Sequence, residues 1–116
     1  MSRNSTQLLL GHMLESAREA HGYVAALERP ALDTNRLLQH GLVRCIEVIG
    51  EAAARLDSDF RESHTEVPWH KIIAMRNRLV HAYFDIDLDV VWSTAKIELP
   101  KLIRMLEALS AEYRTE

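Results

Sequence analysis

Side chains suited to anion binding and to proton transfer lie close together in the second half of the chain. Arg76 and His81 are separated by four residues, and Tyr83 follows after one more. A guanidinium binds anionic oxygens through paired hydrogen bonds, and imidazole is the side chain whose ordinary pKa lies nearest neutral pH. Each residue also has an ordinary explanation: Arg76 at the core edge or paired with Glu47 or Glu51, His81 as a solvated helix-end histidine, and Tyr83 as an interfacial aromatic.

Helical periodicity predicts how the surrounding segment positions these residues. We expect a helix from Trp69 to between Val80 and Phe84, with Pro68 near its first turn. At about 100° per residue, one face of this helix is apolar. Its members are Trp69, Ile72, Ile73, Leu79, Val80 and Tyr83. Arg76 falls in the middle of that face, where a guanidinium is costly unless it is paired or faces a cleft or partner.

The spacing of Arg76 and His81 limits how they can act together. Five residues on one helix separate them by about 140°, so one continuous helix does not direct both side chains to one point. Either the helix unwinds before His81, or a second chain completes the site.

Composition indicates a single helical domain covering residues 1–116. Aromatic residues are only 6%, which disfavours a β-sandwich or barrel. Cys45 is the only cysteine, so an internal disulfide and a CxxC metal site are excluded. The net charge of −3 restricts nucleic-acid contact to a local patch or a groove between two subunits. Neither a signal peptide nor a membrane span is expected, which favours a cytoplasmic protein.

Three further amphipathic helices are expected. They cover about Ser5–Leu27, capped by Ser5 or Thr6; Asp33 or Thr34 to Leu56; and Leu88–Tyr113, kinked at Pro100, while Asp57–Glu66 is expected to be irregular and Asp85–Asp87 a turn and cap. Gly41 and Gly50 lie inside the second helix, where glycine costs about 1 kcal/mol against alanine, so each is expected at a close helix–helix contact. The predicted fold is all-α, an antiparallel up-and-down bundle of four main helices.

The run from Arg76 to Tyr83 has the form arginine, four residues, histidine, one residue, tyrosine. It resembles the signature of the HEPN superfamily of helical RNases, and specifically of the HepT-like toxins, in which a polar residue such as Asn77 follows the arginine. The resemblance covers nearly the whole chain. Its other matching segments are Glu47–Ala52, Trp69–Ile73, Phe84–Asp87, Val91–Trp92 and Leu99–Pro100.

This resemblance implies a HEPN-like bundle acting as a metal-independent endoribonuclease, with no cofactor and no metal site. Arg76 and His81 would be catalytic, Asn77 would orient His81 or bind phosphate, and Arg78 would support phosphate binding. In this reaction a base takes the proton of the ribose 2′-hydroxyl, and that oxygen attacks the adjacent phosphorus. Together with Arg78, we expect Lys71 and Lys96 as candidates to line the path of the RNA.

The resemblance also implies partners. HEPN proteins are homodimers with facing motifs, and HepT-like toxins are paired with an MntA-like minimal nucleotidyltransferase antitoxin that transfers AMP to the tyrosine matched by Tyr83. The chain would then be the toxin of a type VII toxin–antitoxin pair. Two other interpretations stay open: a catalytically silent HEPN binding module that partners a nucleotidyltransferase, and a dimeric scaffold whose polar motif serves only packing.

Overall fold

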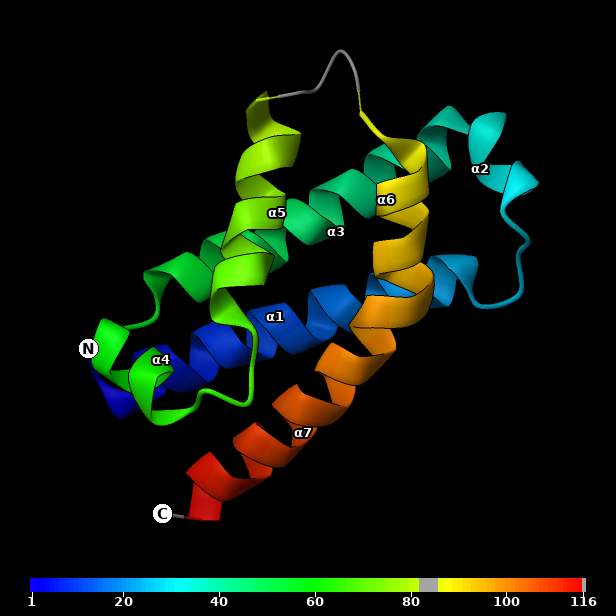
Figure 1. Cartoon of the computed structure of the whole chain (residues 1–116). Helices are drawn as coiled ribbons and strands as arrows, with labels where there is room; N and C mark the ends of the chain where they lie inside the picture. Colours follow the sequence, from blue (N-terminus) through cyan, green and yellow to red (C-terminus); the bar gives the residue numbers. More distant parts are fainter. Residues whose placement is uncertain (82–85, 116) are drawn as a thin grey trace.

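The structure is a computed structural model that describes residues 1–81 and 86–115, without the side chains of residues 80, 81, 114 and 115. Every regular element in these ranges is helical, which confirms the all-α class (Figure 1). The elements are α1 (Arg3–Val24), α2 (Pro30–Asp33), α3 (Arg36–Arg55), α4 (Ser58–Ser63), α5 (Trp69–His81), α6 (Leu88–Ser93), the π-helix η1 (Thr94–Glu98) and α7 (Leu99–Thr115). Of the expected turn before α6, Asp85 lies outside the described residues, as do Tyr83 and Phe84.

The first long helix begins earlier than its periodicity indicates. Ser2 caps α1, because its hydroxyl oxygen accepts a hydrogen bond from the Ser5 backbone N–H at 3.0 Å. The expected caps Ser5 and Thr6 are therefore wrong, and both residues lie inside the helix. The helix ends at Val24, one turn before the expected Leu27.

The second long helix is preceded by a short one. Asp33 belongs to α2 and Thr34 is its C-cap, so neither residue is free to begin the next helix. Asn35 caps α3 instead, and its side-chain oxygen accepts from the Leu38 backbone N–H at 3.0 Å. The expected start at Asp33 or Thr34 is wrong by two to three residues, since Pro30 opens a separate turn of helix.

The core lies where α1 packs against α3 and α7, and α5 packs on α3 (Figure 1). Figure 1 shows α5 crossing α3 rather than running along it. The largest fully buried side chains are Leu10, Met13, Val24, Leu32, Leu42, Leu56, Val67, Val91, Leu106 and Leu109. Within the described residues, no helix combines the length and apolar character needed to cross a bilayer.

The segment expected to be irregular contains the short helix α4. Its residue Phe60 is partly buried and packs against the rings of His64, Trp69 and Tyr113, with centroid distances of 4.4, 6.3 and 5.6 Å. The expectation missed α4 because the segment is polar apart from this one ring. A single aromatic contact to distant parts of the chain gives no periodic signal.

The last helical segment bends before Pro100, as the expected kink requires, and Figure 1 shows α6 and α7 running in different directions. The bend is the π-helix η1, in which the Leu99 N–H bonds to the Thr94 carbonyl five residues back. Proline has no N–H, so the Ala95 carbonyl lacks its helical donor. His21 Nδ1 lies 3.3 Å from this carbonyl oxygen and supplies the missing hydrogen bond.

Lys96, in the same π-helix, stabilises the end of α1. Its Nζ donates to the carbonyl oxygens of Val24, Ala25 and Leu27 at 2.9, 3.1 and 3.0 Å. The ammonium also lies 5.4 Å from the centroid of the Trp92 ring. A cation placed on three C-terminal carbonyls satisfies groups that a helix end leaves without partners.

Candidate functional site

The candidate site is carried by α5, whose start is fixed by hydrogen bonds around Trp69. The Trp69 ring is buried, and its Nε1–H donates to the His64 carbonyl at 2.9 Å. The Pro68 carbonyl accepts from the Ile72 N–H at 3.1 Å and so closes the first turn. From this start the helical register places Arg76 toward α3, while Asn77 is exposed.

Gly50 allows α5 to approach α3 closely at Arg76. A Cβ atom added to Gly50 would lie 2.2 Å from the Arg76 Cβ, 2.8 Å from its Cγ and 3.2 Å from the Ile72 carbonyl oxygen. No side chain larger than hydrogen fits there without moving α5. The expected helix–helix contact at Gly50 is thus confirmed, and at Gly41 the nearest atom is Cε2 of the Tyr23 ring of α1, at 3.3 Å.

The guanidinium of Arg76 has no partner among the described residues. Its Nε is fully buried and makes no hydrogen bond. The two carboxylates expected as ordinary partners pair within α3 instead, Glu47 with Arg44 and Glu51 with Arg55, each at 4.0 Å. An unsatisfied buried donor costs about 1–3 kcal/mol. The stability of the fold therefore does not explain why an arginine stands at position 76.

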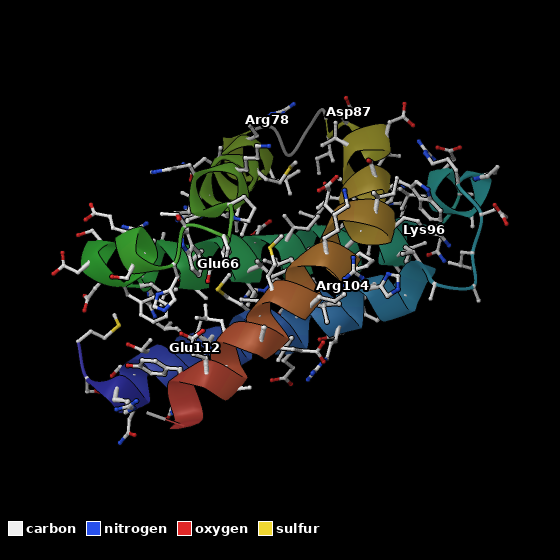
Figure 2. The ribbon with its side chains drawn as sticks, turned by 60° about the horizontal axis from the view of Figure 1, so that its bottom comes forward. Glu66, Arg78, Asp87, Lys96, Arg104 and Glu112 are labelled. Carbon is white, nitrogen blue, oxygen red and sulfur yellow. The ribbon has the colours of Figure 1, made fainter. Side chains whose placement is uncertain are left out.

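The other described motif residues face outward. Asn77 and Arg78 are exposed, and Figure 2 shows Arg78 at the outer edge of α5, directed away from the bundle. The structure therefore places the half-buried Arg76 on one side of α5 and the polar pair on another, as the periodicity predicts.

The helix does not unwind before His81. Residues Trp69–His81 are continuously α-helical, so the first of the two alternatives, unwinding before His81, is excluded. An angular separation of about 140° persists between the two positions. The His81 side chain and the whole of Tyr83 lie outside the described residues.

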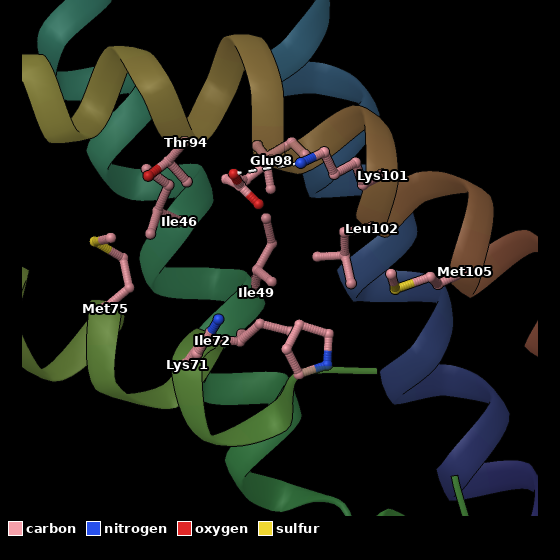
Figure 3. Close-up of a pocket in the computed structure, with 12 residues that line it drawn as sticks. Ile46, Ile49, Lys71, Ile72, Met75, Thr94, Glu98, Lys101, Leu102 and Met105 are labelled. Atoms are coloured by element: carbon pink, nitrogen blue, oxygen red, sulfur yellow. Dashed lines mark ion pairs between the residues drawn. The ribbon is translucent and has the colours of Figure 1, made fainter. Parts of the chain in front are cut away.

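Two lysines were expected along an RNA path, and the structure separates them. The prediction for Lys96 is wrong, because its ammonium donates hydrogen bonds to three carbonyls at the end of α1. Lys71 is exposed and lies at the rim of a cavity of about 290 Å³ between α3, α5 and the η1–α7 segment (Figure 3). The walls are mainly apolar, formed by Ile46, Ile49, Ile72, Met75, Leu102 and Met105. Arg76, Asn77 and Arg78 do not line this cavity, so it is separate from the motif.

A second hollow is lined by two arginines and a histidine that the sequence analysis did not connect. It is about 570 Å³ and lies along the first half of α3, where Arg36, His40 and Arg44 line it together with Ile86 and Leu88. The regular spacing of four residues is a signal in the sequence, but only the fold shows that a hollow lies beside it. In the described part of the chain, no group of three or more His, Cys, Asp or Glu side chains is arranged to hold a metal ion.

Comparison with known proteins identifies the family. The family profile described as "Ribonuclease HepT-like" matches residues 13–109. The chain belongs to the HepT-like ribonuclease family. The match spans α3 and α5 and therefore includes both helices that meet at Gly50 and Arg76.

Individual HepT-like relatives agree with this assignment. "Putative RNase MJ1380" of Methanocaldococcus jannaschii is 32% identical over 107 residues, covering 92% of this chain and 98% of the relative. "Putative RNase MJ1216" of the same organism is 31% identical, covering 94% and 90%. "Probable ribonuclease HepT" of Thermococcus cleftensis is 41% identical over 71 residues, covering 61% and 64%. No solved structure matches the chain.

Proposed function

We propose that this HepT-like protein is a metal-independent endoribonuclease, with Arg76 and His81 as its catalytic residues. The observation that carries the proposal is the guanidinium of Arg76, a half-buried residue at the close contact with Gly50, whose fully buried Nε makes no hydrogen bond with a described residue. A guanidinium without a partner among the described residues can offer its terminal N–H groups to a phosphate, which accepts such hydrogen bonds in pairs. RNA is the substrate class that the family's ribonuclease description supports.

In the proposed reaction, one His81 imidazole accepts the proton of the ribose 2′-hydroxyl. The 2′-oxygen bonds to phosphorus, the bond from phosphorus to the 5′-oxygen breaks, and a protonated second His81 gives that oxygen its proton. The products are a 2′,3′-cyclic phosphate and a 5′-hydroxyl, and the proton count balances. Arg76 binds the non-bridging oxygens as negative charge grows in the transition state. Asn77 and Arg78 bind or orient the neighbouring groups.

The active form would be a homodimer. Because α5 is continuous through His81, Arg76 and His81 of one helix diverge, so the partner's motif supplies the missing group. α5 packs principally on α3, which leaves another side of it open to a second protomer. A monomeric mass at micromolar concentration, measured by light scattering, would contradict this part of the proposal.

The protein would act in the cytoplasm as the toxin of a type VII pair with an MntA-like nucleotidyltransferase antitoxin. Transfer of AMP from ATP to the Tyr83 hydroxyl, with release of pyrophosphate, would add an anion near Arg76. That phosphate would compete with RNA for the guanidinium and repel the substrate. A Tyr83→Phe variant should keep cleavage and lose AMP incorporation; if it loses cleavage while still accepting AMP, these roles are wrong.

The central test is cleavage of total RNA by purified protein, wild type against His81→Ala and Arg76→Ala, with EDTA present. We expect fragments ending in a cyclic phosphate from the wild type only, and none from DNA of the same sequence, because DNA lacks the nucleophile. Mass spectrometry of the fragments identifies the ends. Equal RNA integrity with wild type and His81→Ala, at equal growth of expressing cells, would contradict the ribonuclease and favour a silent binding module.

A further inference from the structure

The first half of α3 presents two arginines and a histidine on three successive turns. Arg36, His40 and Arg44 are spaced by four residues, which advances each along the helix axis by about 6 Å. All three are exposed, and all three line the hollow of about 570 Å³ beside α3. We call these three residues the α3 stripe.

The α3 stripe is poorly neutralised by the protein itself. Glu47 is the one carboxylate among the described residues that line the hollow, and its nearest stripe atom is Arg44 Nη1 at 4.0 Å. Arg36 and His40 make no hydrogen bond or ion pair with a described residue. An exposed pair at such a distance contributes little. Two exposed arginines with little neutralisation therefore stand on a protein whose net charge is −3.

The α3 stripe leads to the candidate site. Glu47 precedes Gly50 by one helical turn, and Gly50 lies against Arg76. On the other side, Ile86 lines the same hollow and follows His81 by five residues, so their Cα atoms are at most about 18 Å apart. Figure 1 shows the end of α5 and the start of α6 on the same side of α3.

We propose that the α3 stripe binds the sugar–phosphate backbone of the RNA strand and guides it to Arg76 and His81. The inference rests on the proposed function and names its binding path. A row of donors at constant spacing suits a polymer with one charge per unit, and a cationic groove that follows the backbone is how proteins bind single strands. Val43, Ile86 and Leu88 add apolar surface along the same hollow, against which bases can pack.

The test measures RNA binding against salt concentration in the His81→Ala background, where the RNA stays intact. The variant is Arg36→Gln with Arg44→Gln. Its matched control is Arg18→Gln with Arg104→Gln, which removes the same charge from exposed positions on α1 and α7. Each lost phosphate contact lowers the slope of log affinity against log salt by about 0.7 for a single strand, so we expect a decrease of about 1.4 for the stripe variant and none for the control.

A kinetic measurement with His81 intact gives a second, independent readout. The stripe variant should raise KM for RNA several-fold and leave kcat unchanged, because a contact made equally in ground and transition states affects binding only. If the salt slope and KM are unchanged in a variant that still cleaves RNA, the α3 stripe does not bind RNA although the protein is a ribonuclease. That result would point to a protein partner for the α3 stripe. If the wild type neither cleaves nor binds RNA, the proposed function itself fails.

Discussion

Polar groups are hydrogen-bonded at the bend at η1, whereas one is left without a hydrogen bond where α5 crosses α3. At the bend, Pro100 leaves the Ala95 carbonyl without a helical donor, and His21 supplies one at 3.3 Å. Next to it, Lys96 satisfies three carbonyls of the α1 end. At the crossing, the buried Arg76 Nε has no partner in the described part of the chain.

This difference distinguishes polar groups that stabilise the fold from the one that we propose binds substrate. A fold in which distant side chains donate to carbonyls left open by a proline is able to satisfy its polar groups. The exception at Arg76 therefore marks a place where stability has been given up, as happens at sites that bind something else. Substitutions at the two places should therefore affect stability and RNA cleavage differently.

The largest effect is expected for Arg76→Met. Methionine keeps much of the aliphatic stem that packs on Gly50 but removes the guanidinium, so RNA cleavage should fall by about 10²–10³-fold. The free energy of unfolding should stay equal or rise by about 1 kcal/mol, since the unsatisfied buried donor is gone. Single-turnover cleavage and urea denaturation measure the two quantities. A marked loss of stability would make Arg76 a structural residue and remove the contrast.

Lys96→Met should show the reverse pattern. The three carbonyl oxygens of Val24, Ala25 and Leu27 lose their charged donor, so the protein should be destabilised by about 2–3 kcal/mol. Cleavage per folded molecule should stay within about twofold. The control is Lys101→Met, whose exposed ammonium pairs with Glu98 at 3.7 Å, and which should cost less than about 1 kcal/mol. Equal unfolding midpoints for the two variants would contradict the assignment.

Gly50→Ala tests whether the crossing positions Arg76. The added methyl group would overlap the Arg76 Cβ, so we expect a destabilisation of about 1–3 kcal/mol despite the better helix propensity of alanine. Cleavage should fall as α5 moves. At Gly11 nothing lies within 4 Å of the added Cβ, so Gly11→Ala should instead stabilise the protein by about 0.5–1 kcal/mol. Similar effects at both glycines would refute the close contact.

The smallest effect concerns Cys45, a buried group of α3 that needs no partner. Burial, with a contribution from Glu19, raises the pKa of the Cys45 thiol to about 11. The folded pKa lies above the ordinary value near 8.5. The stabilisation that the protonated thiol contributes is therefore complete at pH values below 8.5 and is lost as the pH rises through 11. Relative to Cys45→Ala, the wild type should lose about 1 kcal/mol between pH 8 and 9.5. A pH-independent difference in unfolding free energy would contradict this.

Periodicity in the sequence was enough to predict the helical class, the course of α5 and the position of Arg76 on its apolar face. The close contact at Gly50 was also predictable, because glycine inside a helix needs a reason. The helix α4 and the carbonyl contacts of Lys96 were not, since each depends on residues far apart in the chain. A lysine in a helix looks the same in sequence whether it faces solvent or a helix end, and only the bend at η1 decides between them.

The aromatic contacts of Phe60 have a practical consequence for handling the protein. Tyr113 at the end of α7 meets Phe60, and Arg3 at the start of α1 lies 4.8 Å from the Tyr113 ring centroid. Figure 1 shows both termini gathered at this end, away from the end of α5 that carries His81. A label or a solid support attached at either terminus would therefore lie away from the His81 end of α5 and leave that end accessible.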